Sequence, residues 1–144
     1  QTLQAEGVPT GPVKVGMMVE IPAAAVLAEE FAKEVDFFSI GTNDLTQYTL
    51  AVERGNAAVA HLYAPEHPAV LRLIAMTAQA AAERHIPCGM CGEAAGDPKL
   101  APAFVGMGVN ELSMSPRRVP AVRKLLSGLT MDECRQAAEK LLHP

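Results

Sequence analysis

Short apolar runs alternate with longer amphipathic segments along the chain, a pattern that predicts strands connected by helices. The first run, Val13–Val19, is rich in β-branched residues and methionine and is bounded by glycine and proline, so we expect a buried strand. In the next segment, Ala23–Val35, the apolar side chains of Leu27, Phe31 and Val35 are four residues apart. This spacing predicts an amphipathic helix with those three side chains on one face.

The same alternation recurs three times further along the chain. We expect strands over Asp36–Ile40, Ile86–Met90 and Asn110–Met114, and helices from near Leu45 and over Ala69–Arg84, Pro98–Val105, Val119–Leu126 and Met131–Leu142. Strands that alternate with helices pair in parallel, because each helix returns the chain to the same end of the sheet. The predicted fold class is therefore α/β. Four units make half of a TIM barrel, although an open doubly wound sheet has the same alternation.

A sheet of four parallel strands leaves two edges and one face without a partner. The predicted strands are rich in Val, Met, Ile and Phe, so we expect the face that would line a barrel to be apolar. An exposed apolar face of this kind normally binds a partner. We therefore expect copies of the chain to associate through it as a homo-oligomer.

Composition narrows the class of protein further. The 144 residues, 49% hydrophobic and 19% charged, are typical of one globular domain over residues 1–144. A net charge of -4 without charged blocks argues against nucleic acid as a partner, and no apolar run is long enough to insert into a membrane. Three cysteines without a signal segment favour a cytoplasmic location. The chain begins with Gln1, so we expect a piece of a longer protein.

Polar residues that can carry chemistry follow the predicted strands, at the end where a TIM barrel builds its active site. Glu20 and Asp44 follow two consecutive strands and would bring two carboxylates together, which is how proteins usually hold Mg²⁺. For Glu20 the alternative is a solvated carboxylate or a pair with a lysine. For Asp44 the alternative is the N-cap of the following helix, a role that a metal ligand can share.

Arg54 and Cys91 are two further candidates. Arg54 follows a predicted helix, from where a guanidinium can reach a phosphate or carboxylate at the rim. A surface ion pair with Glu53 or another neighbour is the alternative. Cys91 precedes Gly92 at a strand end, where a thiol suits a general acid or nucleophile, and a buried filler is the alternative. Cys88 and Cys91 have the spacing of a redox or zinc pair, but alternation puts them on opposite faces of the strand.

Three motifs together resemble a known family. Met18–Ala24 is MVEIPAA, Asp36–Tyr48 is DFFSIGTNDLTQY, and Gly89–Glu93 is GMCGE, with AGDP shortly after it. In this order and at these separations they closely resemble the C-terminal domain of phosphotransferase system enzyme I, over nearly the whole chain. Pyruvate phosphate dikinase and phosphoenolpyruvate synthase share the barrel and the Asn-Asp motif. Tyr48, the AVERGN segment and the closing LSMS are more similar to enzyme I.

The resemblance implies a Mg²⁺-dependent phosphotransferase that uses phosphoenolpyruvate. It implies metal ligands at Glu20 and Asp44, phosphate contacts at Asn43 and Arg54, and a proton donor at Cys91. In this chemistry the phosphoryl group passes to a histidine, which serves a histidine phosphocarrier protein, and protonation of the enolate gives pyruvate. The family's histidine-bearing domain and first four barrel strands have no counterpart here, so we expect no complete turnover from this chain alone.

Three other interpretations stay open. The chain can belong to a pyruvate phosphate dikinase or phosphoenolpyruvate synthase, or to a magnesium-dependent carbon–carbon lyase on the same barrel. A lyase would need neither a histidine domain nor a thiol acid. The third is a dimerisation module, because the C-terminal domain of the resembled family also carries its dimer contact.

Overall fold

A computed structural model describes residues 2–143. Within them, four strands form one parallel sheet in the order β1-β2-β3-β4: Gly16–Val19 (β1), Phe37–Gly41 (β2), Cys88–Cys91 (β3) and Glu111–Leu112 (β4). The α-helices are Thr2–Ala5 (α1), Pro22–Val26 (α2), Ala28–Phe31 (α3), Thr42–Leu50 (α4), Pro68–Glu83 (α5), Ala101–Met107 (α6), Val119–Ser127 (α7) and Met131–Leu142 (α8). Two 3₁₀ helices, Ala60–Leu62 (η1) and Glu93–Gly96 (η2), lie in the connections.

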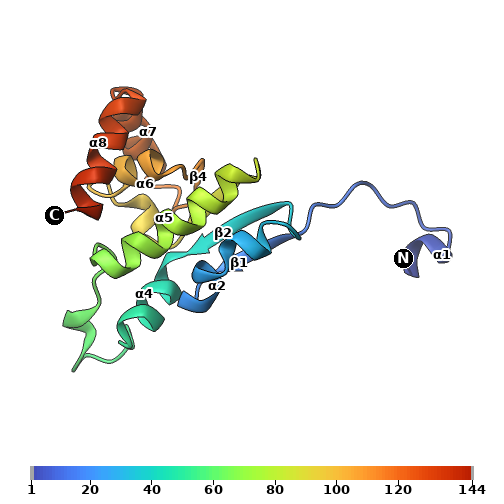
Figure 1. Ribbon diagram of the computed structural model, residues 1–144, viewed down its shortest axis with the longest axis horizontal. Helices are drawn as coiled ribbons and strands as arrows, with labels where there is room; N and C mark the ends of the chain where they lie inside the picture. The colour runs from blue at the N-terminus through green and yellow to red at the C-terminus, as the bar shows by residue number, and fades with distance from the viewer. Residues whose placement is uncertain (1, 144) are drawn as a thin grey trace.

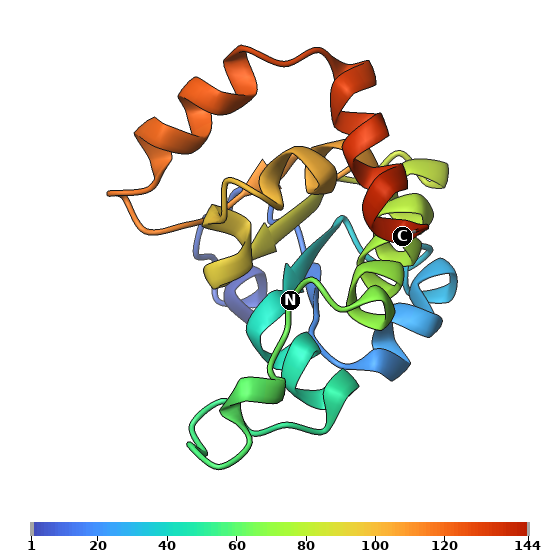
Figure 2. The same cartoon turned by 90° about the vertical axis from the view of Figure 1, so that its left-hand side faces the viewer.

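The order of the sheet confirms the predicted half barrel. Consecutive strands are neighbours, all three pairs are parallel, and each strand is followed by helical segments. This is the arrangement of half of a (β/α)8 barrel. In Figure 1, α5 crosses the sheet, with α2 and α4 on one side of it and α6, α7 and α8 on the other. Figure 2 shows the connection between α4 and α5 protruding from the body.

One face of the sheet carries the hydrophobic core. The strand register aligns Val19, Ile40, Met90 and Leu112 in a row across the four strands. Val19 and Ile40 are fully buried, as is Phe38 in the neighbouring row, and the apolar side of α5 belongs to the same core. Burying a side chain of this size contributes roughly 1.5–3 kcal/mol. This face therefore holds the sheet and its helices together.

The opposite face is not the apolar surface expected from the sequence. Its central row consists of Met18, Ser39, Gly89 and Glu111. Side chains alternate along a strand, and the alternation sends Val19, Ile40 and Phe38 to the covered side. This row thus mixes one methionine with a hydroxyl, a glycine and a carboxylate, and partly buried Phe37 adds one aromatic ring to the same face. The prediction of an apolar barrel-lining face was wrong, and with it the reason given for association through that face.

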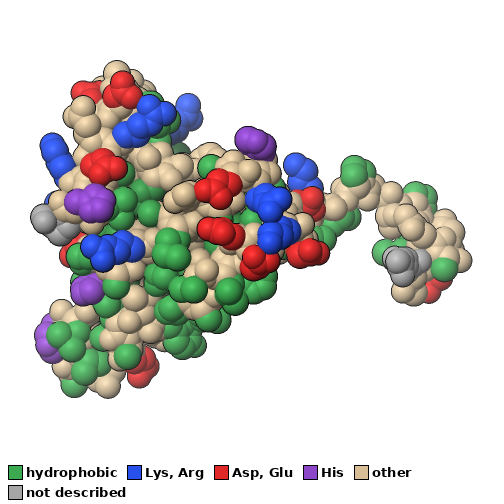
Figure 3. Space-filling view, in the orientation of Figure 1, with side chains coloured by type: hydrophobic (Ala, Val, Ile, Leu, Met, Phe, Trp, Pro, Cys, Tyr) green, Lys and Arg blue, Asp and Glu red, His purple; other side chains and the backbone are tan. Residues whose placement is uncertain are grey.

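The helix predicted over Ala23–Val35 is also wrong in detail. It is two short helices, α2 and α3, which meet at Leu27. Leu27 has φ −98° and ψ 17°, and its side chain is 50% exposed instead of buried. The buried positions are Ala24, Ala25, Ala28 and Ala32, whose small side chains let α2 and α3 pack closely on α5. Phe31 and Val35 pack against the core as predicted but stay partly exposed. Figure 3 shows hydrophobic side chains exposed over α2 and the adjoining surface of α5.

Other boundaries agree more closely with the sequence. Helices α5, α7 and α8 begin and end within one residue of the prediction, and α8 starts with a capping box between Thr130 and Glu133. The small helix expected over Pro98–Val105 is displaced toward the C-terminus as α6. Strand β1 starts only at Gly16, and the side chains just before it, including Val13, are exposed. Strand β4 has two residues where five were predicted.

The N-terminal segment lies apart from the sheet. Residues 8–15 are exposed and have no regular secondary structure, and in Figure 1 they lead from α1, which lies away from the body, to β1. Among residues 2–143, no helix combines the length and the hydrophobicity needed to cross a membrane.

Candidate functional site

The C-terminal ends of β1, β2 and β3 bring two predicted site residues into one row. Gly41 of β2 pairs with Cys91 of β3. On its other side Gly41 lies against Glu20, because a Cβ built at position 41 would be 3.0 Å from the Glu20 Oε2 atom. Glycine therefore keeps the space between the Glu20 carboxylate and Cys91 free of a side chain. We call Glu20, Gly41 and Cys91 the rim row.

Asp44 lies in the first turn of α4 and forms an ion pair with Arg54. The distance from Arg54 Nη2 to Asp44 Oδ1 is 3.5 Å, with 44% and 39% of the two side chains exposed. Such an exposed pair contributes about 0–1 kcal/mol, so it orients the two groups more than it stabilises the fold. The N-cap of α4 is Gly41 rather than Asp44, so the capping alternative is wrong. Arg54 therefore forms a surface ion pair, as the alternative for this residue expected, but its partner is Asp44 and not Glu53.

Arg54 reaches Asp44 because the chain reverses after α4. Ala51 ends the helix in the left-handed conformation at φ 53°. The backbone N–H of Val52 then donates to the Gln47 carbonyl at 3.0 Å, and that of Arg54 donates to the Gln47 side-chain oxygen at 3.3 Å. The turn therefore directs the Arg54 guanidinium back toward α4, which carries Asp44.

Two side chains at the start of α4 bind the backbone at the end of β3. The Thr42 hydroxyl donates to the Cys91 carbonyl at 2.8 Å, and the Asn43 side-chain oxygen accepts from the Glu93 backbone N–H at 3.2 Å. Gly92, between those two backbone groups, has φ +101°, and a Cβ there would be 2.3 Å from the Thr42 hydroxyl oxygen. We call the two hydrogen bonds the rim clamp. They hold the turn after Cys91 against α4.

Tyr63 anchors the connection between α4 and α5 at the same place. Its hydroxyl donates to the backbone carbonyl of Asn43 at 3.3 Å. Burial raises the pKa of this hydroxyl above its usual value, and the nearby positive charge of Arg54 partly opposes that rise. Asn43 thus makes contacts to two further segments, the end of β3 through its side chain and this connection through its backbone.

The three cysteines have different environments. Cys91 is partly exposed at the rim, whereas Cys88 and Cys134 are buried, and burial raises the pKa of the Cys88 thiol to about 12. Exposure alternates along β3, which confirms that Cys88 and Cys91 lie on opposite faces of the strand. Cys91 is therefore the accessible thiol of the chain, and Cys88 belongs to the core.

Glu20 and Asp44 are the candidate metal ligands. Both are partly exposed, and within residues 2–143 no lysine, arginine or histidine pairs with Glu20. The same residues contain no group of three or more His, Cys, Asp or Glu side chains that would form a complete protein cage. Mg²⁺ needs no such cage, because one or two carboxylates with water and substrate phosphate usually hold it. This donor set fits Mg²⁺.

A cleft of about 530 Å³ extends from Asn43 across the ends of β3 and β4. It is lined by Asn43, Gly92, Glu93, Ser113, Met114, Ser115 and Arg118. Arg118 is held there by its Nη1 group, which donates to the Gly96 carbonyl at 3.1 Å. The polar end of the fourth strand therefore joins the rim, as predicted. Three residues of this region were not predicted as part of it: Thr42, Tyr63 and Arg118.

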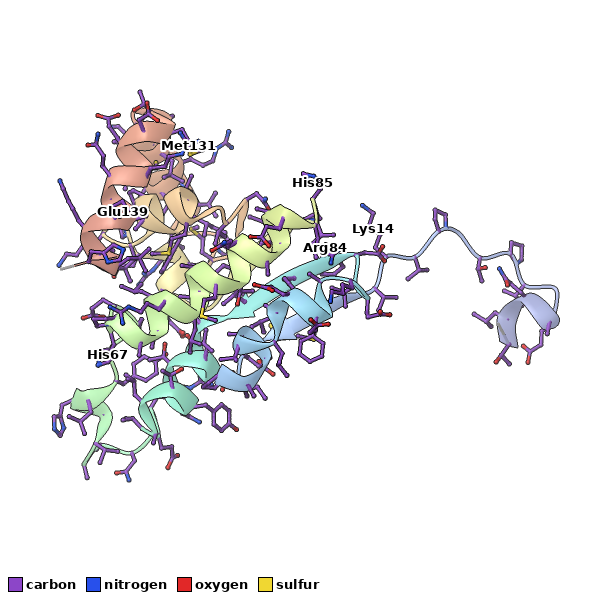
Figure 4. The ribbon with its side chains drawn as sticks, in the orientation of Figure 1. Lys14, His67, Arg84, His85, Met131 and Glu139 are labelled. Atoms are coloured by element: carbon purple, nitrogen blue, oxygen red, sulfur yellow. The ribbon has the colours of Figure 1, made fainter. Side chains whose placement is uncertain are left out.

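The histidines offer no phosphate carrier at this rim. His67 is the N-cap of α5, and its Nδ1 atom accepts from the Ala69 backbone N–H at 3.1 Å. His85 follows the other end of the same helix, as Figure 4 shows. None of the residues that line the cleft is a histidine.

Residues 1–131 match the family model described as PEP-utilising enzyme, PEP-binding domain. The chain is 56% identical over 127 residues to a phosphoenolpyruvate-protein phosphotransferase from Latilactobacillus sakei. It is 51% identical over 130 residues to proteins of the same name from Bacillus subtilis (strain 168) and from Haemophilus influenzae. These alignments cover 88%, 90% and 90% of this chain but 22%, 23% and 23% of the relatives. The chain thus spans less than a quarter of their length.

Proposed function

The chain belongs to the family of PEP-binding domains of PEP-utilising enzymes, and we propose that it is the part of a phosphoenolpyruvate-protein phosphotransferase that binds Mg²⁺ and phosphoenolpyruvate and protonates the enolate. The relatives with 51–56% identity carry that name. Because the chain spans only part of their length, the complete reaction and its partners are proposed for the intact protein.

The rim row is the observation that carries this proposal. It places the Glu20 carboxylate and the Cys91 thiol on opposite sides of Gly41, whose missing side chain leaves access between them. Asn43 and Asp44 follow Gly41 directly on α4. Glu20 for the metal, Asn43 for the phosphate and Cys91 for the proton would therefore come from adjacent strand ends. Phosphoryl transfer from phosphoenolpyruvate with protonation of the enolate needs these three groups close together.

Asn43 would contact the phosphate as a hydrogen-bond donor. Its side-chain oxygen accepts from the Glu93 N–H, and a backbone donor fixes the orientation of the amide because it needs an acceptor. The amide NH₂ group is then the part that can bind a substrate oxygen. Arg54 would add a guanidinium, which suits the paired oxygens of a phosphate or carboxylate.

Glu20 and Asp44 would hold Mg²⁺, which when bound neutralises negative charge on the substrate oxygens. The Arg54 ion pair keeps the Asp44 carboxylate at the rim in the absence of a ligand. A dianionic substrate and a divalent cation would replace this pair with two new ones. We therefore expect metal and substrate to bind together more strongly than either does alone.

Cys91 would supply the proton. The bond between phosphorus and the enol oxygen breaks as a bond forms between phosphorus and a nitrogen of the acceptor histidine. The electrons left on the enolate take the Cys91 thiol proton at the terminal carbon, which gives pyruvate and a thiolate that solvent reprotonates. Partial exposure of Cys91 permits both proton transfers.

The acceptor histidine would lie on another domain of the intact protein, which in turn would phosphorylate a histidine phosphocarrier protein. Residues 1–144 would form one partial barrel domain. Three free cysteines are compatible with the cytoplasmic location that belongs to the proposal.

The proposal also includes a homo-oligomer. Its support is the exposed apolar side chains at the two edges of the sheet instead of the open face. Exposed Met18 and Leu27 lie beside the free edge of β1. The opposite edge, near α7, carries exposed Met131 in an apolar hollow, so a second copy offers a second apolar surface.

Calorimetry on the intact protein tests the metal assignment. We expect phosphoenolpyruvate-dependent Mg²⁺ binding to weaken at least about tenfold in Glu20→Ala and in Asp44→Ala, which is about 1.4 kcal/mol of binding free energy. Asp132→Ala is the matched control, since Asp132 pairs with Arg135 on α8 instead of lying at the rim. Unchanged binding in both rim variants would remove these two carboxylates from the metal site.

A further inference from the structure

We infer that the rim clamp is a positioning device for Cys91: Thr42 and the side-chain oxygen of Asn43 set where the thiol lies by holding the backbone on both sides of Gly92. The inference rests on the proposed role of Cys91 as the proton donor. Thr42 itself contacts neither the thiol nor a substrate, so it acts through the Cys91 backbone.

Thr42 is placed for this role by the fold around it. It lies at the start of α4 and is 1% exposed. Its hydroxyl donates a hydrogen bond to the Cys91 carbonyl, 49 positions later in the chain. An N-terminal threonine in a helix commonly caps its own helix. Here the hydroxyl binds the neighbouring strand instead, and α4 has no side-chain cap. The hydrogen bond therefore serves the junction between β2 and β3.

Gly92 explains why the turn needs a clamp. Its φ of +101° and ψ of 176° belong to a region that residues with a side chain rarely adopt. A Cβ there would also meet Thr42 Oγ1 at 2.3 Å and Asn43 Oδ1 at 2.8 Å. The residue next to Cys91 is thus a glycine, the residue type with the fewest backbone restrictions. The side chains of Thr42 and Asn43 restrict it from one side. Without them, Cys91 would end a strand that continues into an unrestrained glycine.

Asn43 has two separable functions in this arrangement. Its oxygen completes the clamp by accepting from the Glu93 N–H, while its NH₂ group is the proposed phosphate contact. Asn43→Asp keeps an acceptor oxygen for Glu93 but removes the donor, whereas Asn43→Ala removes both. The two variants therefore separate positioning of the turn from binding of the substrate.

The rate at which iodoacetamide alkylates Cys91 measures the position of the thiol without any turnover. The rate is followed on the intact protein by mass spectrometry of the Cys91 peptide over a range of pH. We expect Thr42→Val to accelerate alkylation about two- to tenfold, the effect of losing one hydrogen bond. Thr42→Ser should restore the wild-type rate. Thr77→Val is the matched control, because Thr77 is a fully buried threonine whose hydroxyl donates to the Leu73 carbonyl within α5.

A wild-type rate in a folded Thr42→Val protein, or an equal acceleration in Thr77→Val, overturns the inference. If Thr42→Val does not fold, hydrogen exchange of the peptide that contains Glu93 decides: it should be faster in Asn43→Ala than in Asn43→Asp. Equal exchange in these two variants overturns the inference as well. Both measurements are independent of phosphoryl transfer. Failure of the proposed function would appear instead as full turnover in Cys91→Ala.

Discussion

The middle of the sheet and its edges differ in how many hydrogen bonds and buried contacts hold their residues in place. After β2, Thr42 and Asn43 form hydrogen bonds with the backbone at and just after the end of β3. The neighbouring apolar residues Ile40 and Leu45 are fully buried. At the free edge of β1, Glu20 has no cation partner in residues 2–143, and the side chains of Met18 and Leu27 are about half exposed. Strand β4 at the other edge has two residues.

This difference separates the candidate site into two parts. The groups proposed for phosphate and proton, Asn43 and Cys91, are positioned by contacts inside the chain. Glu20, the carboxylate proposed for the metal, lies at an edge where a half barrel has no further strand. We therefore expect substitutions in the middle to alter chemistry and stability strongly, and substitutions at the edge to have effects that depend on what the intact protein packs there.

The largest effect is expected for Cys91→Ala. The intact variant should still bind phosphoenolpyruvate but form pyruvate ~10² to 10⁴-fold more slowly, because that is the usual contribution of a general acid. Steady-state kinetics together with a direct binding measurement test this. Cys134→Ala is the control, since Cys134 is a buried thiol on α8 away from the rim. Full pyruvate formation in Cys91→Ala would remove Cys91 from the mechanism.

The second prediction compares the stability lost at a core residue of β2 with the stability lost at a residue of the edge strand β1. Phe38→Ala removes a fully buried ring from β2 and should lower the free energy of unfolding by about 3–5 kcal/mol. Met18→Ala removes a side chain that is 45% exposed on β1, and an exposed position typically changes stability by about 0.5 kcal/mol or less. Urea denaturation measures both. Equal losses would mean that the edge is packed as tightly as the middle.

Two glycines with positive φ provide a smaller and sharper test. Gly92→Ala places a Cβ against Thr42 and Asn43, whereas a Cβ at Gly108, φ +106°, would have nothing closer than 3.8 Å. Both variants incur backbone strain of roughly 1–3 kcal/mol. Gly92→Ala should therefore be the less stable of the two and the one that changes Cys91 alkylation. Equal stability with unchanged alkylation would contradict the tight packing at Gly92.

The last prediction concerns pH. The pKa of the Cys88 thiol is raised from 9.0 to about 12, so the folded protein keeps this proton where the unfolded chain has lost it. The resulting stability is fully present below pH 9 and is lost as pH rises from 9 toward 12. Cys88→Ala should lower stability at neutral pH and flatten this alkaline decline. A thermal melt series over that range, with Cys134→Ala as control, would show an unchanged decline if Cys88 were not responsible.

The sequence predicted the order of the elements and the family better than the contacts within the site. Regular periodicity located α5, α7 and α8, because their apolar faces and caps are local features of the chain. It failed in part at Ala23–Val35, where alanines are buried and Leu27 is exposed, although Phe31 packs against the core as expected. Period alone does not say which of two apolar faces is buried. It also failed for the open face of the sheet, because the alternation of side chains sends the apolar residues Val19, Ile40 and Met90 to the covered face.

The candidate site shows the same limit. Glu20, Asn43, Asp44 and Cys91 were predicted because each follows a strand, and the parallel sheet brings strand ends together. Their assignment as ligands, phosphate contact and acid stays a prediction. Thr42 lies beside Asn43 and Asp44 in the sequence, but its bond to Cys91 depends on strand register. Tyr63 comes from an irregular connection, and no periodic signal pointed to its contact with Asn43.

The anchored hydroxyl of Tyr63 makes the chain suitable for optical work. The chain contains no tryptophan and two tyrosines, so its near-ultraviolet absorbance comes from very few chromophores. Tyr63 ionises at higher pH than an ordinary phenol because it is partly buried, and it does so only as long as the connection between α4 and α5 stays docked on Asn43. Phenolate absorbance, assigned by comparison with Tyr63→Phe, would therefore report the opening of this connection without an added dye or label.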